Sequence, residues 1–137
     1  MQKIMAYFLL VISILTITGS CLAFSSARNN ENIEFLNSYG WEVDDEPLEK
    51  VSINIPETFD DVYNNYNSIQ LEAGLDLSKY KGKSAIRYTY LVLNYPEDVG
   101  EDVRANIILV DNTPVAGDIM TTSISGFMHS LCYPENH

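Results

Sequence analysis

The chain begins with one long apolar run, and shorter periodic segments follow it. Residues 4 to 17 are apolar and uncharged, with only Met1-Gln2-Lys3 before them and Thr18-Gly19-Ser20-Cys21 after them. A positive start, an apolar run of this length and a small-residue end are typical of a secretory signal, and the run is short for a membrane span of about 20 residues. The pattern predicts that residues 1–23 direct export.

The end of this signal has three interpretations. Residues 18–21 resemble a weak lipobox, in which Cys21 would carry a lipid, although Leu is preferred where Thr18 stands. Ordinary cleavage could instead follow Ala23 or Ala27, and without cleavage the run would stay as a membrane anchor. All three predict an extracytoplasmic domain that is either associated with the cell membrane or secreted.

The next segments predict a spacer followed by short elements. Residues 24–32 are polar and lack periodicity, which predicts a tether. Apolar positions in residues 33–39 share one helical stripe, and Gly40 suits the left-handed position after a helix, so a short helix is expected here. Alternation over residues 41–43 and 51–55 predicts two short strands, or one strand and an extended arm.

A longer amphipathic helix is predicted from Thr58 to Ala73. Thr58 can cap its start, Asp60 and Asp61 would lie in the first turn beside the positive end of the dipole, and Gly74 would end it. One face of this helix is formed by residues that recur at spacings of three and four: Phe59, Val62, Tyr63, Tyr66, Ile69, Gln70 and Ala73. Such a helix needs a sheet to cover.

The second half of the chain predicts that sheet. Residues 84–94, 103–110 and 114–121 read as strands, and Asp111-Asn112-Thr113 reads as a tight turn. Both faces of the first strand are partly apolar, so both faces of the sheet are expected to be covered. The fold class is α+β: over residues 33–132, a short N-terminal helix and one main helix pack on an antiparallel meander of three to four strands.

Several short motifs in one order resemble the bacterial family called domain of unknown function 4830. The motifs that carry the resemblance lie at residues 39–43, 55–57, 59–63, 66–67, 74–83, 87–90, 94–96, 103–106, 117–119 and 126–129. The resemblance covers nearly all of residues 33–131 and implies a small exported or membrane-tethered domain, with no activity attached. Ala116, Met120 and Ser130 depart from the family pattern, so a thiol site proposed for relatives would not transfer to this chain.

Charge narrows the classes of partner. The net charge is −11, and a surface of this sign repels nucleic acid, which needs clustered Lys and Arg. Residues 42–61 are strongly acidic, whereas Lys79, Lys81, Lys83 and Arg87 form one basic cluster. The acidic segment reads as a solvated face or, alternatively, as an electrostatic docking face.

Metal and thiol chemistry have little support. The carboxylates of residues 97–102 lack the alternating ligands of a calcium loop, and two histidines make a poor zinc set, so no metal or cofactor is predicted. If Cys21 is lipidated or removed, Cys132 is left as an unpaired thiol without an evident base other than His129.

Asp118 and His129 are the strongest candidates for chemistry. Asp118 places a carboxylate within an apolar strand, where a charge must be paired, hydrated or neutralised. An Asp118–His129 pair could act as a general base, but no nucleophile is placed by a recognisable motif. The structural alternative is that Asp118 bonds Arg87 or backbone amides while His129 caps the core. The side chains of Arg87, Asp118 and His129 would meet only if they share a face of the sheet.

Aromatic side chains offer a second candidate surface. Trp41, Tyr88 and Tyr90 could form a platform for a glycan or peptide, although their periodic placement favours core packing. The leading functional prediction is a noncatalytic, membrane-associated extracytoplasmic domain that binds a protein, peptide or envelope polymer. The alternatives are a small envelope hydrolase or other enzyme using Asp118 and His129, and a structural or inhibitory module.

Overall fold

The computed structural model describes residues 25–134. Its elements are a helix over residues 25–38, β1 (Glu49–Asn54), α2 (Asp61–Glu72), the 3-10 helix η1 (Leu77–Tyr80), β2 (Ser84–Leu91), β3 (Arg104–Val110), β4 (Thr113–Met120) and β5 (Met128–His129). The predicted signal, Cys21 and the first 23 residues lie outside this range. In residues 25–134, no helix is both long enough and apolar enough to cross a membrane.

The chain divides between Glu31 and Asn32 into two units, and the fold described below belongs to the second. Residues 25–32, expected to lack regular structure, are helical. Periodicity detects only helices with an apolar stripe, whereas this segment is polar and carries an Arg28–Glu31 ion pair one turn apart. Its role as a tether stays a prediction.

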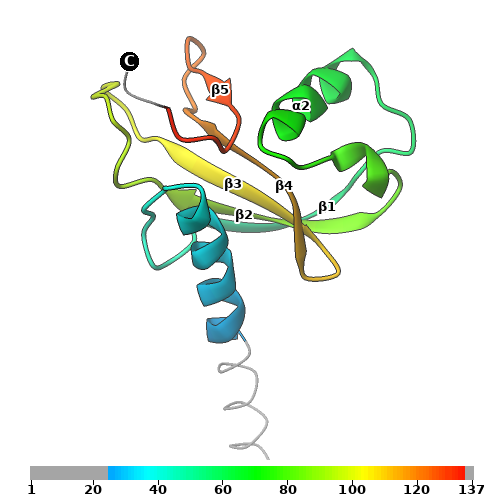
Figure 1. Cartoon of the computed structure of the whole chain (residues 1–137), viewed down its shortest axis with the longest axis horizontal. Helices are drawn as coiled ribbons and strands as arrows, with labels where there is room; N and C mark the ends of the chain where they lie inside the picture. The colour runs from blue at the N-terminus through cyan, green and yellow to red at the C-terminus, as the bar shows by residue number, and fades with distance from the viewer. Residues whose placement is uncertain (1–24, 135–137) are drawn as a thin grey trace, which may run out of the picture. The chain divides into compact units, whose positions relative to one another are not determined.

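The five strands form one antiparallel sheet in the order β1-β2-β3-β4-β5 (Figure 1). The predicted α+β class and meander are confirmed, and the sheet has one strand more than expected. That strand, β5, has only two residues and is too short for alternation to indicate it. Asp111 and Asn112 both have positive φ, 47° and 64°, as the predicted tight turn requires of a two-residue hairpin.

One face of the sheet is a dense apolar core. Leu36, Trp41 and Leu131 pack there against strand residues, and all three are fully buried. The Trp41 indole donates a 2.7 Å hydrogen bond from Nε1 to the Leu131 carbonyl, and its ring centroid lies 4.7 Å from that of Tyr133. This face satisfies the polar tip of its largest side chain while burying the rest.

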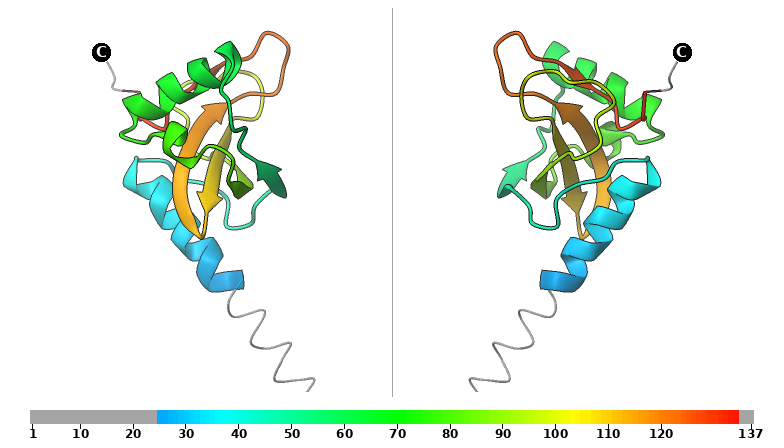
Figure 2. Two further views of the ribbon diagram at one scale, coloured as in Figure 1. Left: turned by 90° about the vertical axis from the view of Figure 1, so that its right-hand side faces the viewer. Right: turned by 90° about the vertical axis from the view of Figure 1, so that its left-hand side faces the viewer.

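The other face is covered by α2 and η1. Asp60 caps α2 by accepting a 2.9 Å hydrogen bond from the Tyr63 amide, so the prediction that Thr58 caps the helix is wrong. Within the predicted stripe, Gln70 is fully buried as expected, but Val62 is 72% exposed and its assignment to the packed face is wrong. Figure 2 shows α2 crossing close to the C-terminal end of β4.

Candidate functional site

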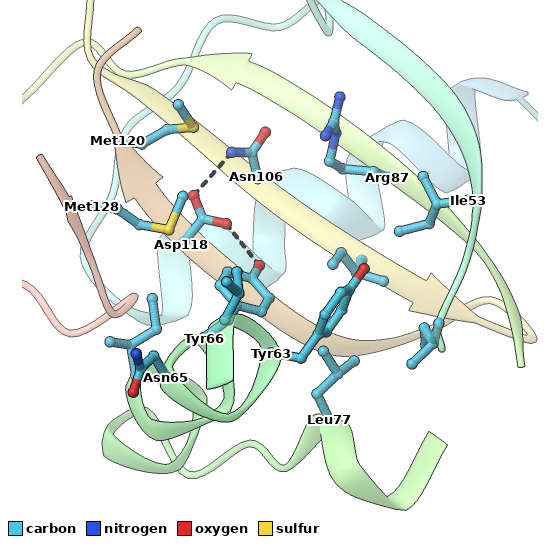
Figure 3. A pocket seen from close by; sticks show the side chains of 14 residues that line it. Ile53, Tyr63, Asn65, Tyr66, Leu77, Arg87, Asn106, Asp118, Met120 and Met128 are labelled. Atoms are coloured by element: carbon cyan, nitrogen blue, oxygen red, sulfur yellow. Dashed lines mark hydrogen bonds between the residues drawn. The ribbon is translucent and has the colours of Figure 1, made fainter. Parts of the chain in front are cut away.

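A pocket of about 590 Å³ lies between α2 and the sheet. Most of its wall is apolar, and the polar exceptions come from the middle of the sheet and from α2 (Figure 3). Its lining residues are Ile53, Ile55, Val62, Tyr63, Asn65, Tyr66, Ile69, Leu77, Arg87, Asn106, Ile108, Asp118, Met120 and Met128.

Three buried polar side chains cross the sheet in a row. Thr89 pairs with Asn106 across β2 and β3, and Asn106 pairs with Asp118 across β3 and β4, so all three point to the α2 side. The Thr89 hydroxyl donates to Asn106 Oδ1 at 2.6 Å, and Asn106 Nδ2 donates to Asp118 Oδ2 at 2.9 Å. We call Thr89, Asn106 and Asp118 the polar row; its hydrogen bonds run in one direction and end on the carboxylate.

Helix α2 completes the coordination of Asp118. The Tyr66 hydroxyl donates to Asp118 Oδ1 at 2.7 Å, so each carboxylate oxygen accepts one hydrogen bond from a neutral donor (Figure 3). Burial raises the pKa of Asp118, while the hydrogen bonds from Asn106 and Tyr66 and the charge of Arg87 oppose the shift. The pKa of Tyr66 also lies well above its ordinary value, first because of burial and then because of Asp118.

Arg87 contributes to the same pocket without pairing with Asp118. Its terminal nitrogen forms a 3.2 Å ion pair with Glu49 Oε2 on the neighbouring strand β1. Its Nε is buried and has no hydrogen-bond partner among the described residues. The structure therefore brings two predicted site residues to one cavity but leaves Asp118 without a cationic partner in the described part of the chain.

His129 lies on the opposite face of the sheet. It pairs with Ile119, the residue next to Asp118, and its ring stacks on Phe127 with centroids 5.5 Å apart. Its Nε2 lies 3.2 Å from the Tyr95 hydroxyl, and its Nδ1 lies 2.7 Å from the Ser130 carbonyl oxygen. An Asp118–His129 dyad is not formed, and His129 packs among aromatic rings of the core face. The expectation that Asp118 bonds Arg87 or backbone amides is wrong, because its two oxygens accept from Tyr66 and Asn106 side chains.

The proposed aromatic platform is also absent. Trp41 and Tyr90 are 0% exposed and Tyr88 is 7% exposed, so these rings cannot receive a glycan or peptide. The prediction of a binding surface at these three residues is wrong, because their alternation follows the core face of the sheet. Tyr90 accepts a 3.1 Å hydrogen bond from Asn32, which satisfies its buried hydroxyl.

The sequence patterns do not single out Asn106, which lies within a family motif. They assign Tyr66 and Gln70 only to the packing face of the helix. A signal for Asn106 did exist, since a lone amide inside the apolar strand Ala105–Val110 needs a buried partner. The Tyr66 contact depends on where α2 crosses the sheet, which periodicity does not specify.

Two other candidates contribute no site. Cys132 is exposed, forms no disulfide among the described residues, and contacts the Glu72 carbonyl oxygen through its Sγ at 3.3 Å, near the end of α2. No group of three His, Cys, Asp or Glu side chains in residues 25–134 is arranged to hold a metal ion.

A model of the family described as Domain of unknown function (DUF4830) matches residues 35–119. The chain belongs to this DUF4830 family. The matched span contains α2 and the complete polar row, whereas β5 and His129 lie beyond it. No curated protein and no solved structure matches the chain significantly.

Proposed function

We propose that this DUF4830 domain is a noncatalytic binding domain that works outside the cytoplasm and holds its ligand in the pocket beside α2. The observation that carries the proposal is a cavity of about 590 Å³ with an apolar wall and a buried carboxylate. Ligand pockets commonly have volumes of about 300 to 1,000 Å³ and a few converging polar groups in an apolar lining. The ligand would be a peptide, a protein side chain or a piece of an envelope polymer.

The side chains around Asp118 favour binding over turnover. None of the described pocket-lining residues is Ser, Cys, Lys or His, so the described wall lacks the serine, cysteine or lysine nucleophile and the histidine base that many hydrolases use. The rival hydrolase requires Asp118 and His129 to act together, and they lie on opposite faces of the sheet.

Ligand binding is tested by a thermal-shift assay on the purified full-length chain with fractionated envelope extract. Val62 lines the pocket and is 72% exposed, so Val62→Trp should place an indole over the cavity without disturbing the core. Leu71, on the same helix and 57% exposed, does not line the pocket, and Leu71→Trp is the matched control. Stabilisation by one fraction should persist in Leu71→Trp and disappear in Val62→Trp; equal responses in both variants would contradict the proposal.

The proposed location outside the cytoplasm is inferred from the apolar run of residues 4–17 and from Cys21. If a lipid on Cys21 is the anchor, Cys21→Ala should move the domain out of the membrane fraction, because each buried methylene of an acyl chain contributes about 0.8 kcal/mol. Cell fractionation and intact mass give the answer. Unchanged membrane retention and mass would exclude lipid attachment and leave the uncleaved anchor as the way in which the domain is held.

A further inference from the structure

Asp118 is a buried acid whose neighbours inside the protein are neutral donors. It is 2% exposed, and its two oxygens accept from the Tyr66 hydroxyl and the Asn106 amide. Arg87, the one basic residue among the described lining residues, is already paired with Glu49 through a terminal nitrogen. A buried charge is stabilised by pairing, so the pocket has a place for a positive group that the described protein does not supply.

The rest of the pocket suits the body of such a group. Tyr63 and Tyr66 present aromatic rings, and Met120 and Met128 flank the carboxylate with flexible, polarisable side chains (Figure 3). Aromatic rings attract ammonium groups, and aliphatic stems pack well on methionine. The net charge of −11 also raises the local concentration of cations around the protein.

We propose that the pocket binds an alkylammonium group, with the ammonium on Asp118 and the alkyl chain along Met120 and Met128. This inference rests on the proposed binding function and names its ligand class. A lysine side chain of a peptide and a free aliphatic amine share this chemistry.

Other ligand classes fit less well. An anion would face the Asp118 carboxylate, and a terminal guanidinium nitrogen of Arg87 is already paired with Glu49. A hard metal cation needs six or more oxygen ligands. Here the neighbours of the Asp118 carboxylate, the Tyr66 hydroxyl and the Asn106 amide, already donate hydrogen bonds to it. A wholly apolar ligand would leave the negative charge unpaired.

Titration calorimetry on the full-length chain in nonionic detergent tests the inference. The probes are pentylamine, the lysine peptide acetyl-Lys-amide and, as a neutral match, pentanol. Saturable binding is expected for at least one amine and not for pentanol; a preference for the peptide points to a polypeptide source, and a preference for pentylamine to a small amine. No saturable binding by either amine, or equal binding of pentanol, would overturn the inference.

Two pairs of variants locate the binding. Asp118→Asn removes the charge with little change in shape and should weaken amine binding at least tenfold, whereas Asp102→Asn makes the same charge change at an exposed position and should not. Met128 is 48% exposed, so Met128→Lys is tolerable for folding and should supply an internal ammonium that blocks amine binding. Met128→Gln, of similar length but neutral, should retain it.

Unchanged affinity in both Asp118→Asn and Met128→Lys would overturn the inference even if amines bind. The proposed binding function fails separately. If envelope extract stabilises the chain in the Val62→Trp-sensitive way but no amine binds, the pocket is a binding site for another class of ligand. If both assays are negative, the binding function itself is wrong.

Discussion

The two faces of the sheet are made from alternate residues of the same strands, yet they differ in kind. On β2, β3 and β4, Tyr90, Ala105 and Ile119 face the apolar core and are fully buried without any charge. Their immediate neighbours, Thr89, Asn106 and Asp118, form the polar row on the α2 side. One side of a strand can therefore stabilise the fold while the other side holds a site.

The polar row is stable only because its members and Tyr66 satisfy one another's hydrogen-bonding groups. Burying an amide or carboxylate without partners costs several kcal/mol, and that penalty is offset here by three hydrogen bonds of 2.6 to 2.9 Å. On the apolar face, exact polar partners are needed at single points, such as the Trp41 indole on the Leu131 carbonyl, and most of the buried surface is apolar. The comparison predicts that the two faces respond differently to mutation.

The largest effect is expected at Trp41 on the apolar face. Trp41→Ala removes a fully buried ring and its hydrogen bond to Leu131, and should lower the free energy of unfolding by about 3 to 5 kcal/mol. Denaturant unfolding measures the change. A loss smaller than that of Tyr66→Phe would show that the apolar face is not the main source of stability.

A smaller loss is expected at Tyr66 on the α2 face. Tyr66→Phe keeps the ring but leaves Asp118 Oδ1 without its donor, and should cost about 1 to 3 kcal/mol. It should also raise the pKa of Asp118 further, since this hydrogen bond opposes the effect of burial. Carboxyl titration by NMR checks the shift, and an unchanged pKa would show that the hydrogen bond is not formed in solution.

Asp118→Asn should have a weaker effect, and one that depends on pH. The Thr89 hydroxyl can reverse its direction and Asn106 can flip, so that the new amide still has partners, with an expected loss of about 1 kcal/mol or less near pH 7.

The sign of the pH effect follows from the raised pKa of Asp118. The folded state binds the Asp118 proton more tightly than the unfolded chain does, so protonation of Asp118 stabilises the folded state. The stabilisation is complete below the ordinary pKa of 3.8 and is lost as the pH rises through the raised pKa of the folded state. Wild type should therefore gain stability relative to Asp118→Asn as pH falls through that window. Arg87, His129 and Tyr66 influence Asp118 but are present in both proteins. A pH-independent difference in melting temperature would contradict the assignment.

The smallest effect is expected at Val62. Because this side chain is 72% exposed, Val62→Ala should change the free energy of unfolding by no more than about 0.5 kcal/mol. Denaturant melts compare it with the Tyr66→Phe protein. A loss of unfolding free energy above about 1 kcal/mol would show that Val62 belongs to the packed face of the helix, as the sequence predicted.

Sequence patterns predicted the sheet better than they predicted the site. Alternation located β2, β3 and β4, and the turn residues Asp111 and Asn112 set their order, because these features depend on local chemistry. The partners of Asp118 depend on strand register and on where α2 crosses β4, which a single chain does not reveal. The prediction that Trp41, Tyr88 and Tyr90 form an exposed surface is wrong, because aromatic residues suit cores and binding surfaces alike.

The buried Gln70 restricts how far α2 can move away from the sheet. Among the described residues, β5 pairs with the outer edge of β4 at Ile119 and Met120. At Gly117, Gln70 Oε1 accepts a 2.7 Å hydrogen bond from the strand amide, in the place of a neighbouring strand. An outward swing of α2 would break this bond and expose an open sheet edge, the kind of surface that promotes aggregation. We therefore expect ligands to enter by rotation of exposed side chains such as Met128, with α2 held as a fixed wall.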